Sequence, residues 1–67
     1  MNTFAEKLKE LREYKKLSMM DLAKQTNISD AAISRWENGQ RNIGSEHLIT
    51  LAKFFGVTTD YLLGLED

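Results

Sequence analysis

Helix start and stop signals recur at short intervals along this chain, and they constrain the fold more than any other feature. Thr3 and Ser18 stand three residues before Glu6 and Asp21, which is the spacing of a capping box at a helix N-terminus. Glycine follows three of the apolar segments, where a left-handed residue ends a helix. The expected N-caps after Ser18 are Ser29, Ser45 and Thr58, and the expected helices span residues 3–16, 19–26, 30–38, 45–55 and 59–63.

Apolar spacing agrees with this division. Phe4, Leu8 and Leu11 recur on one face of the first helix. The chain contains no proline, and no segment alternates with the period of a strand. We therefore expect one compact all-α domain over residues 1–67, and its remaining core residues should be Leu22, Ala23, Ile33, Trp36, Leu48, Leu51, Ala52, Phe55, Val57 and Leu62.

Length and composition exclude several classes of protein. A 67-residue chain is near the lower limit for independent folding and has no room for a separate ligand-sensing domain, so no small-molecule ligand is expected. It has no cysteine and one histidine, which predicts neither a disulfide nor a metal site, and no cofactor is indicated. No nucleophile–base pair or glycine-rich phosphate loop indicates an enzyme. No apolar run approaches the roughly 18 residues of a membrane span, and a cytoplasmic location is expected.

The charge balance argues weakly against a nucleic-acid partner, because nine basic and ten acidic residues give a net charge of −1. The distribution matters more than the sum. Residues 1–24 carry six of the nine cations, whereas four of the acids lie beyond residue 44 beside a single cation. We expect a basic side and an acidic end.

The third helix divides into two unlike halves. At about 100° per residue, one half consists of Asp30, Ala31, Ser34, Arg35 and Asn38, and the other of Ala32, Ile33 and Trp36 with Glu37 at its edge. The first half is either an ordinary solvated face or a strip of small, hydrogen-bonding side chains that a groove could accept. The tight turn "TNIS", residues 26–29, favours the second interpretation, because two short helices joined this way form a helix-turn-helix whose second helix enters the DNA major groove.

Two longer stretches carry a family resemblance. "LSMMDLAKQTNISDAAISRWENG", residues 17–39, resembles the helix-turn-helix of the phage repressor and Cro-type (XRE-like) transcriptional regulators. "LITLAKFFGVTTDYLLG", residues 48–64, is similar to the fourth and fifth helices of that family. The resemblance implies a five-helix, lambda-repressor-like DNA-binding domain with its helix-turn-helix at about residues 18–38. It also implies a homodimer on a palindromic double-stranded operator, usually acting as a repressor.

The expected site residues follow from the helix faces and from this resemblance. Asp30, Ala31, Ser34 and Arg35 would read bases. Glu37 borders the core and needs a partner, for which Arg12 is the best candidate; the alternative is a surface pair of little energetic weight. The resemblance adds a phosphate contact by Arg12 and a phosphate-binding corner where Asn38 and Gly39 expose backbone amides. The complete set expected at the DNA backbone is Arg12, Ser18, Ser29, Asn38, Arg41 and Asn42.

Three residues depart from the family pattern. Met19 replaces a glutamine that binds phosphate in many relatives, and we expect it to pack against its apolar neighbours instead. Asn27 replaces a turn glycine, and it tolerates positive φ better than most residues do. Asp30 replaces Gln, Ser or Thr, and it either stabilises the helix N-terminus or accepts a hydrogen bond from cytosine N4. His47 is expected to face solvent.

Four residues near the corner and the last helix resemble the family's dimer contact, namely Ile43, Val57, Tyr61 and Leu65. A second hypothesis for the function is a protein-interaction module of the same fold with weak or lost DNA binding. Asp30, Met19 and the net acidity favour it.

Overall fold

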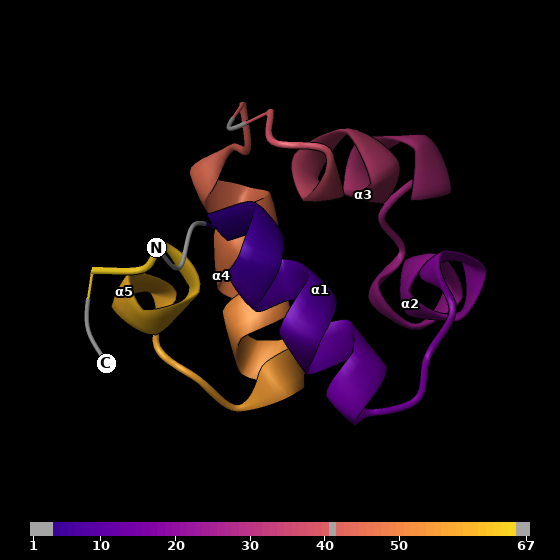
Figure 1. The fold of residues 1–67 in the computed structure, drawn as a ribbon, viewed down its shortest axis with the longest axis horizontal. Helices are drawn as coiled ribbons and strands as arrows, with labels where there is room; N and C mark the ends of the chain where they lie inside the picture. Colours follow the sequence, from indigo (N-terminus) through magenta and orange to yellow (C-terminus); the bar gives the residue numbers. More distant parts are fainter. Residues whose placement is uncertain (1–3, 41, 66–67) are drawn as a thin grey trace.

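The computed structural model describes residues 4–40 and 42–65, and its regular structure there is entirely helical. The five helices are α1 (Phe4–Tyr14), α2 (Met19–Thr26), α3 (Asp30–Glu37), α4 (Ser45–Phe55) and α5 (Thr59–Leu62). In Figure 1, α1 crosses the centre in front of α4, with α2 and α3 on one side and α5 on the other. The predicted all-α, five-helix fold class is confirmed.

The core forms around the inner face of α1. Phe4 and Leu8 are fully buried and meet Leu22 of α2, Ile33 of α3 and Leu51 of α4 in one cluster. α1 packs against both α3 and α5 and so holds these two helices on the same core. Five of the predicted core residues lie half-buried around this cluster rather than inside it, namely Leu11, Ala23, Leu48, Phe55 and Val57.

Lys7 is buried, which the sequence analysis did not anticipate. It stands three residues after Phe4 and therefore shares the apolar stripe of α1. Its Nζ lies 4.2 Å from the centroid of the Tyr61 ring, so the ammonium is held over an aromatic face while its methylene stem covers apolar surface.

Side-chain caps begin three of the helices. Ser18 and Asp21 form a complete capping box at α2, and the hydroxyls of Ser29 and Thr58 cap α3 and α5. The prediction for Ser45 was wrong, because Gly44 occupies the N-cap position of α4 in an extended conformation. The Gly44 carbonyl closes the first turn by accepting from Leu48 N, which leaves Ser45 inside the helix. Thr3 lies outside the described residues.

Four helices end in the same way, with the chain closing over the last turn through two backbone hydrogen bonds. At the end of α1, Lys16 N donates to Glu13 O (2.9 Å) and Leu17 N donates to Arg12 O (3.1 Å). α3, α4 and α5 show the same pair of bonds. We call these four turns the closed corners, and the left-handed residue at each is Lys16, Gly39, Gly56 or Gly64, with φ of 58°, 105°, 71° and 79°.

The closed corner at Lys16 ends α1 earlier than predicted, at Tyr14 rather than residue 16. α2 ends at Thr26, and its C-cap residue Asn27 is left-handed, with φ of 61° and ψ of 30°. Asn27 thus adopts the conformation that was expected of it at the family's glycine position. Apart from one-residue differences at their ends, the other predicted helices agree with the structure.

Candidate DNA-recognition interface

α2, the turn of residues 27–29 and α3 form a helix-turn-helix. The two helices pack against each other, and Ile28 in the turn is buried, which fixes the angle at which the chain passes from α2 to α3. Ser29 then begins α3 by accepting a hydrogen bond from Ala32 N at 3.1 Å. Met19 is half-buried against the core, in keeping with the packing role expected of it.

α3 presents one half to the core and the other to solvent. Ala32, Ile33 and Trp36 are buried, whereas the side chains expected to read bases are exposed or, for Ser34, half-buried. Trp36 anchors the helix by packing, with its ring tilted, against Phe4 of α1 (ring centroids 6.2 Å apart) and His47 of α4 (5.6 Å). His47 is exposed as expected, but its ring also helps to hold Trp36.

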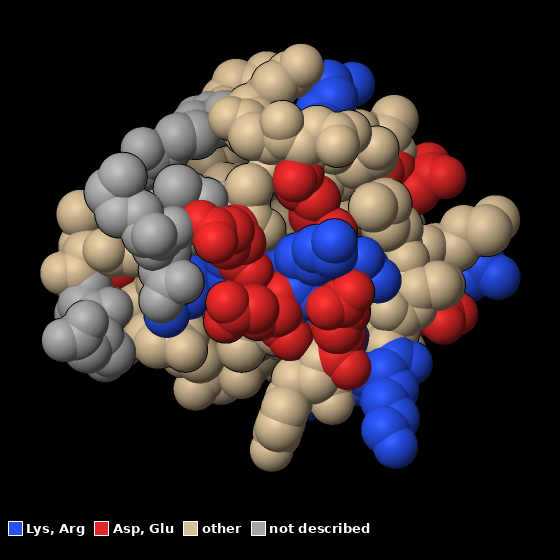
Figure 2. Space-filling view, viewed as in Figure 1, with Lys and Arg blue, Asp and Glu red and all other residues tan. Residues whose placement is uncertain are grey.

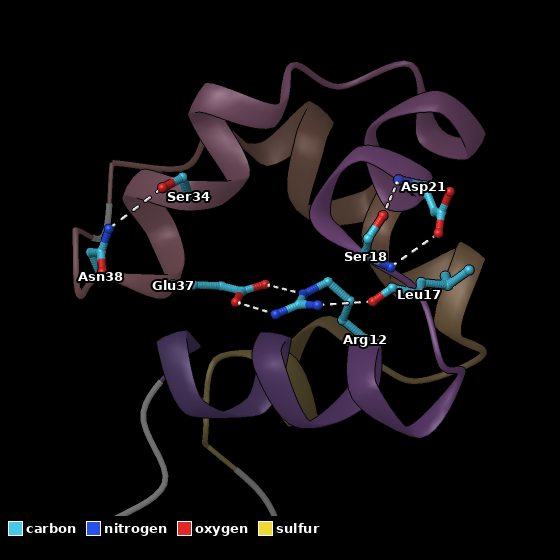
Figure 3. A network of polar contacts seen from close by, with 7 residues as sticks. All are labelled: Arg12, Leu17, Ser18, Asp21, Ser34, Glu37 and Asn38. Carbon is cyan, nitrogen blue, oxygen red and sulfur yellow. Dashed lines mark hydrogen bonds and ion pairs between the residues drawn. The ribbon is translucent and has the colours of Figure 1, made fainter.

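Arg12, on α1, contacts both the end of α3 and the segment that leads into α2 (Figure 3). Its Nε donates to Glu37 Oε2 at 2.7 Å, its Nη2 to Glu37 Oε1 at 2.9 Å, and its Nη1 to the Leu17 carbonyl at 2.8 Å. The side chains are only 11% and 4% exposed, so this is a well-shielded bidentate pair rather than a surface pair. The hydrogen bond to Glu37 raises the pKa of Arg12 above its ordinary value.

The Arg12 contacts fix the end of α3 relative to the start of α2. A guanidinium has five N–H groups, and three of them are used here, which leaves two unused. Of the other residues expected at the DNA backbone, Ser18 and Ser29 lie at the N-caps of α2 and α3, and the rest follow α3 in the chain. The Ser18 and Ser29 hydroxyl oxygens accept backbone bonds in the caps. The Ser29 hydroxyl proton remains available to an acceptor, whereas the Ser18 side chain is also bonded to the Asp21 carboxylate. Asn42 is exposed, and Arg41 lies outside the described residues.

The capping box also affects Asp21. Its carboxylate accepts from Ser18 N at 3.1 Å, and this backbone bond, together with the bond from the Ser18 side chain, lowers the pKa of Asp21. A charged carboxylate in the first turn of α2 complements the helix dipole.

The expected phosphate corner after α3 requires a correction. Asn38 and Gly39 do not expose their amides, because Asn38 N donates to Ser34 O (3.0 Å) and Gly39 N to Trp36 O (3.1 Å). Gln40 N likewise donates to Arg35 O at 3.1 Å. These amides complete a closed corner, so a phosphate contact here would have to come from side chains. The Asn38 side chain itself lies 3.5 Å from Ser34 Oγ.

Charge on the molecular surface is more mixed than predicted. Figure 2 shows acidic side chains gathered over α1 beside basic ones. The exposed acids on this helix are Glu6, Glu10 and Glu13. Because they share the N-terminal third of the chain with most of the cations, the expected basic side is not uniformly basic.

The four residues expected at a dimer contact are placed unequally. Ile43 and Val57 are half-buried and pack against the core of their own chain. Tyr61 is half-buried with Lys7 over its ring. Leu65 is 70% exposed. Most of the apolar surface attributed to the contact is therefore already covered within the chain, and Leu65 is the residue left open.

Two parts of the site were not anticipated. The Leu17 carbonyl is an acceptor for Arg12, and Lys16 adopts a left-handed conformation. Backbone acceptors leave no trace in residue type, so sequence reasoning had no means of finding the first. The left-handed conformation of Lys16 could have been predicted, because the first helix has to end before Leu17.

Within residues 4–40 and 42–65 there is no pocket and no group of His, Asp or Glu side chains arranged to hold a metal ion. In the same part of the chain, every helix is too short or too polar to cross a bilayer.

Comparison with known proteins places this geometry in a family. Residues 8–62 match the family described as helix-turn-helix. Over 96% of its length the chain is 45% identical to the HTH-type transcriptional activator BcrR of Enterococcus faecalis, of which it covers 31%. It is 34% identical over 94% of its length to Repressor protein C2 of Salmonella phage P22, covering 30%, and 31% identical over 96% to an uncharacterized HTH-type regulator, YobD, of Bacillus subtilis, covering 57%.

The chain thus spans between about a third and just over half of the length of these relatives. Their names are those of transcriptional regulators rather than enzymes. The chain belongs to the helix-turn-helix family of regulators of the phage repressor and Cro type.

Proposed function

We propose that this chain binds double-stranded DNA sequence-specifically in a transcriptional regulator, with α3 in the major groove. The observation that carries the proposal is the two-sided construction of α3. Its exposed half is small and hydrogen-bonding, while its other half is anchored by Trp36 and by the Arg12–Glu37 pair. The regulators to which the chain is similar support the same function.

Each exposed residue of α3 has a chemistry suited to a base edge. The planar fork of Arg35 matches O6 and N7 of guanine. Asp30 would accept from cytosine N4, Ala31 would meet a thymine methyl, and Ser34 would bond to either partner of a base pair. Within the described residues, no ion pair joins Arg35 to Asp30 or Glu37. Both Glu37 oxygens are bonded to Arg12 instead.

Backbone phosphates would be held around the Arg12 junction. The two unused Arg12 N–H groups would be donors there, and Ser18, Ser29 and the Asn38 side-chain amide would add contacts at the ends of α2 and α3. Arg41 and Asn42 extend the set beyond α3. These contacts would set the orientation of the domain without reading sequence.

We propose a homodimer on a palindromic operator, with half-sites about one helical turn apart, ~10 bp. The exposed Leu65 side chain supports this proposal, and Ile43, Val57 and Tyr61 would lie at the margin of the dimer contact. Repression fits this domain most simply, because occupying the DNA is enough to block RNA polymerase, whereas activation needs an additional contact. Operator binding would take place in the cytoplasm.

The experiment that tests the proposal is selection of bound duplexes from a random oligonucleotide pool. Fluorescence anisotropy would then compare the selected duplex with a scrambled one at several salt concentrations. We expect the selected duplex to bind roughly 10³-fold or more tightly, with affinity for both duplexes falling as salt rises. Equal affinity for the two duplexes would refute sequence-specific binding.

The second candidate is a protein-interaction module of the same fold. Asp30 favours it, because an exposed carboxylate at the first position of α3 repels phosphate, and so does the net charge of −1. In that case the chain would show no salt-dependent binding to any duplex.

A further inference from the structure

One of the four closed corners has lysine at the left-handed position where the other three have glycine. Lys16 adopts φ of 58°, and its counterparts are Gly39, Gly56 and Gly64. A left-handed backbone brings Cβ close to the following carbonyl oxygen, so glycine is favoured there and lysine is strained. The other three closed corners end a helix without this strain, which indicates that Lys16 has a further role.

Electrostatics at the helix end does not account for this lysine. A cation near a helix C-terminus is stabilising, but Arg12 and Lys15 already supply positive charge at the end of α1. Packing does not account for it either. Lys15 reaches toward Phe54, with Nζ 5.5 Å from the ring centroid, whereas Lys16 is exposed and contributes no side-chain bond or ring contact within the described residues.

The position of Lys16 suggests what the side chain does. It precedes Leu17, whose carbonyl accepts from Arg12, and Arg12 holds Glu37 at the end of α3. Figure 3 shows Leu17 and Ser18 beside the Arg12–Glu37 pair, at the junction of α1, α2 and α3. Two residues of backbone span at most about 7 Å, so the Lys16 ammonium extends from a point next to the N-cap of α2.

We propose that Lys16 is a further DNA-contacting residue, whose ammonium binds an operator phosphate beside the start of α2. This inference rests on the proposed function. A phosphate is the expected partner because Lys16 lies outside α3, away from the base edges, and a lysine ammonium is a flexible point charge without directional preference. The lysine thus lowers the stability of the corner while raising the affinity for DNA.

The test is Lys16→Gly, which should change stability and binding in opposite directions. Removing the left-handed strain should raise Tm by about 4 °C or more. Losing one phosphate contact should weaken binding roughly five- to ten-fold at 0.1 M salt, equally for selected and scrambled duplexes. The slope of log K against log salt should become shallower by about 0.9 per half-site.

Three further variants make the test specific. Lys16→Asn also lacks the charge but tolerates left-handed φ, so it should reproduce the binding loss. Lys16→Arg should keep the salt slope without raising Tm. Lys15→Gln removes the neighbouring charge at the same corner, and it should leave the slope nearly unchanged. A similar loss in Lys15→Gln and Lys16→Gly would mean that net charge alone is responsible, which would overturn the inference.

The outcomes separate this inference from the proposed function. If the wild-type chain binds no duplex in a salt-dependent manner, the proposed function fails. If the wild-type chain binds and Lys16→Gly binds with the same affinity and slope, only the role of Lys16 is refuted, and the lysine does no more than end a helix.

Discussion

Replacing Glu37 with alanine is expected to destabilise the fold by about 3 kcal/mol, because it leaves a shielded guanidinium without its counter-charge. The Arg12 and Glu37 side chains are 11% and 4% exposed, and the carboxylate accepts at 2.7 Å and 2.9 Å. Without the Glu37 carboxylate, the Leu17 carbonyl is the one hydrogen-bond acceptor that Arg12 keeps within the described residues. An exposed pair would contribute less than about 1 kcal/mol. For a domain of this size the loss should lower Tm by more than about 10 °C.

Urea unfolding followed by the fluorescence of Trp36, the one tryptophan of the chain, measures this loss. Arg12→Ala, Glu37→Ala and the double variant complete a thermodynamic cycle, and we expect a coupling free energy of about 2 kcal/mol. Glu10→Ala, on the exposed face of α1, is the matched control and should change stability by less than about 0.5 kcal/mol. Single losses that simply add in the double variant would refute the reasoning, because the two side chains would then not stabilise each other.

Four further substitutions test the remaining assignments. Arg35→Ala should cost about 1–3 kcal/mol on the selected operator and relax preference at one base pair. Arg41→Ala should weaken binding to all duplexes alike. Fluorescence anisotropy on operator and scrambled DNA distinguishes the effects of these two variants. Equal losses of affinity for both duplexes in Arg35→Ala would contradict base reading. Because Ser18 lowers the pKa of Asp21 below 3.8, the carboxylate stabilises the fold above that pH, and this stabilisation disappears as pH falls through the folded-state pKa. The difference in unfolding free energy between wild type and Asp21→Asn should therefore be present at pH 6 and decrease as the pH is lowered through the folded-state pKa, and a constant difference would contradict the assignment. Leu65→Glu should leave Tm unchanged while weakening self-association in sedimentation velocity, and an unaffected dimer would exclude Leu65 from the contact.

The parts of the fold that were predictable are those set by local chemistry. Ser18, Ser29 and Thr58 each cap a helix through their own hydroxyl and an amide three residues away, so residue type and spacing are sufficient to find them. The division of α3 was equally accessible, because helical periodicity alone separates Trp36 from Arg35.

The parts that were missed depend on how backbone groups compete for partners. Asn38 and Gly39 were expected to offer amides to a phosphate, but the carbonyls of the last turn of α3 accept them first. Gly44 begins α4 without any side-chain bond, so the neighbouring hydroxyl of Ser45 was misleading. Lys7 was overlooked because its charge suggests exposure, although its stem lies along the apolar stripe of α1.

If α3 reads bases as proposed, its anchoring from one side would let regulators with this fold diverge in what they recognise. Ala31 and Arg35 are exposed and lie outside the core cluster, whereas Trp36 and Glu37 hold the helix in place. Substitutions at the exposed positions would then alter the preferred operator without first being compensated elsewhere in the chain. After a gene duplication, two copies can therefore acquire separate target sites through a few changes on one helix, while both continue to fold on the same framework.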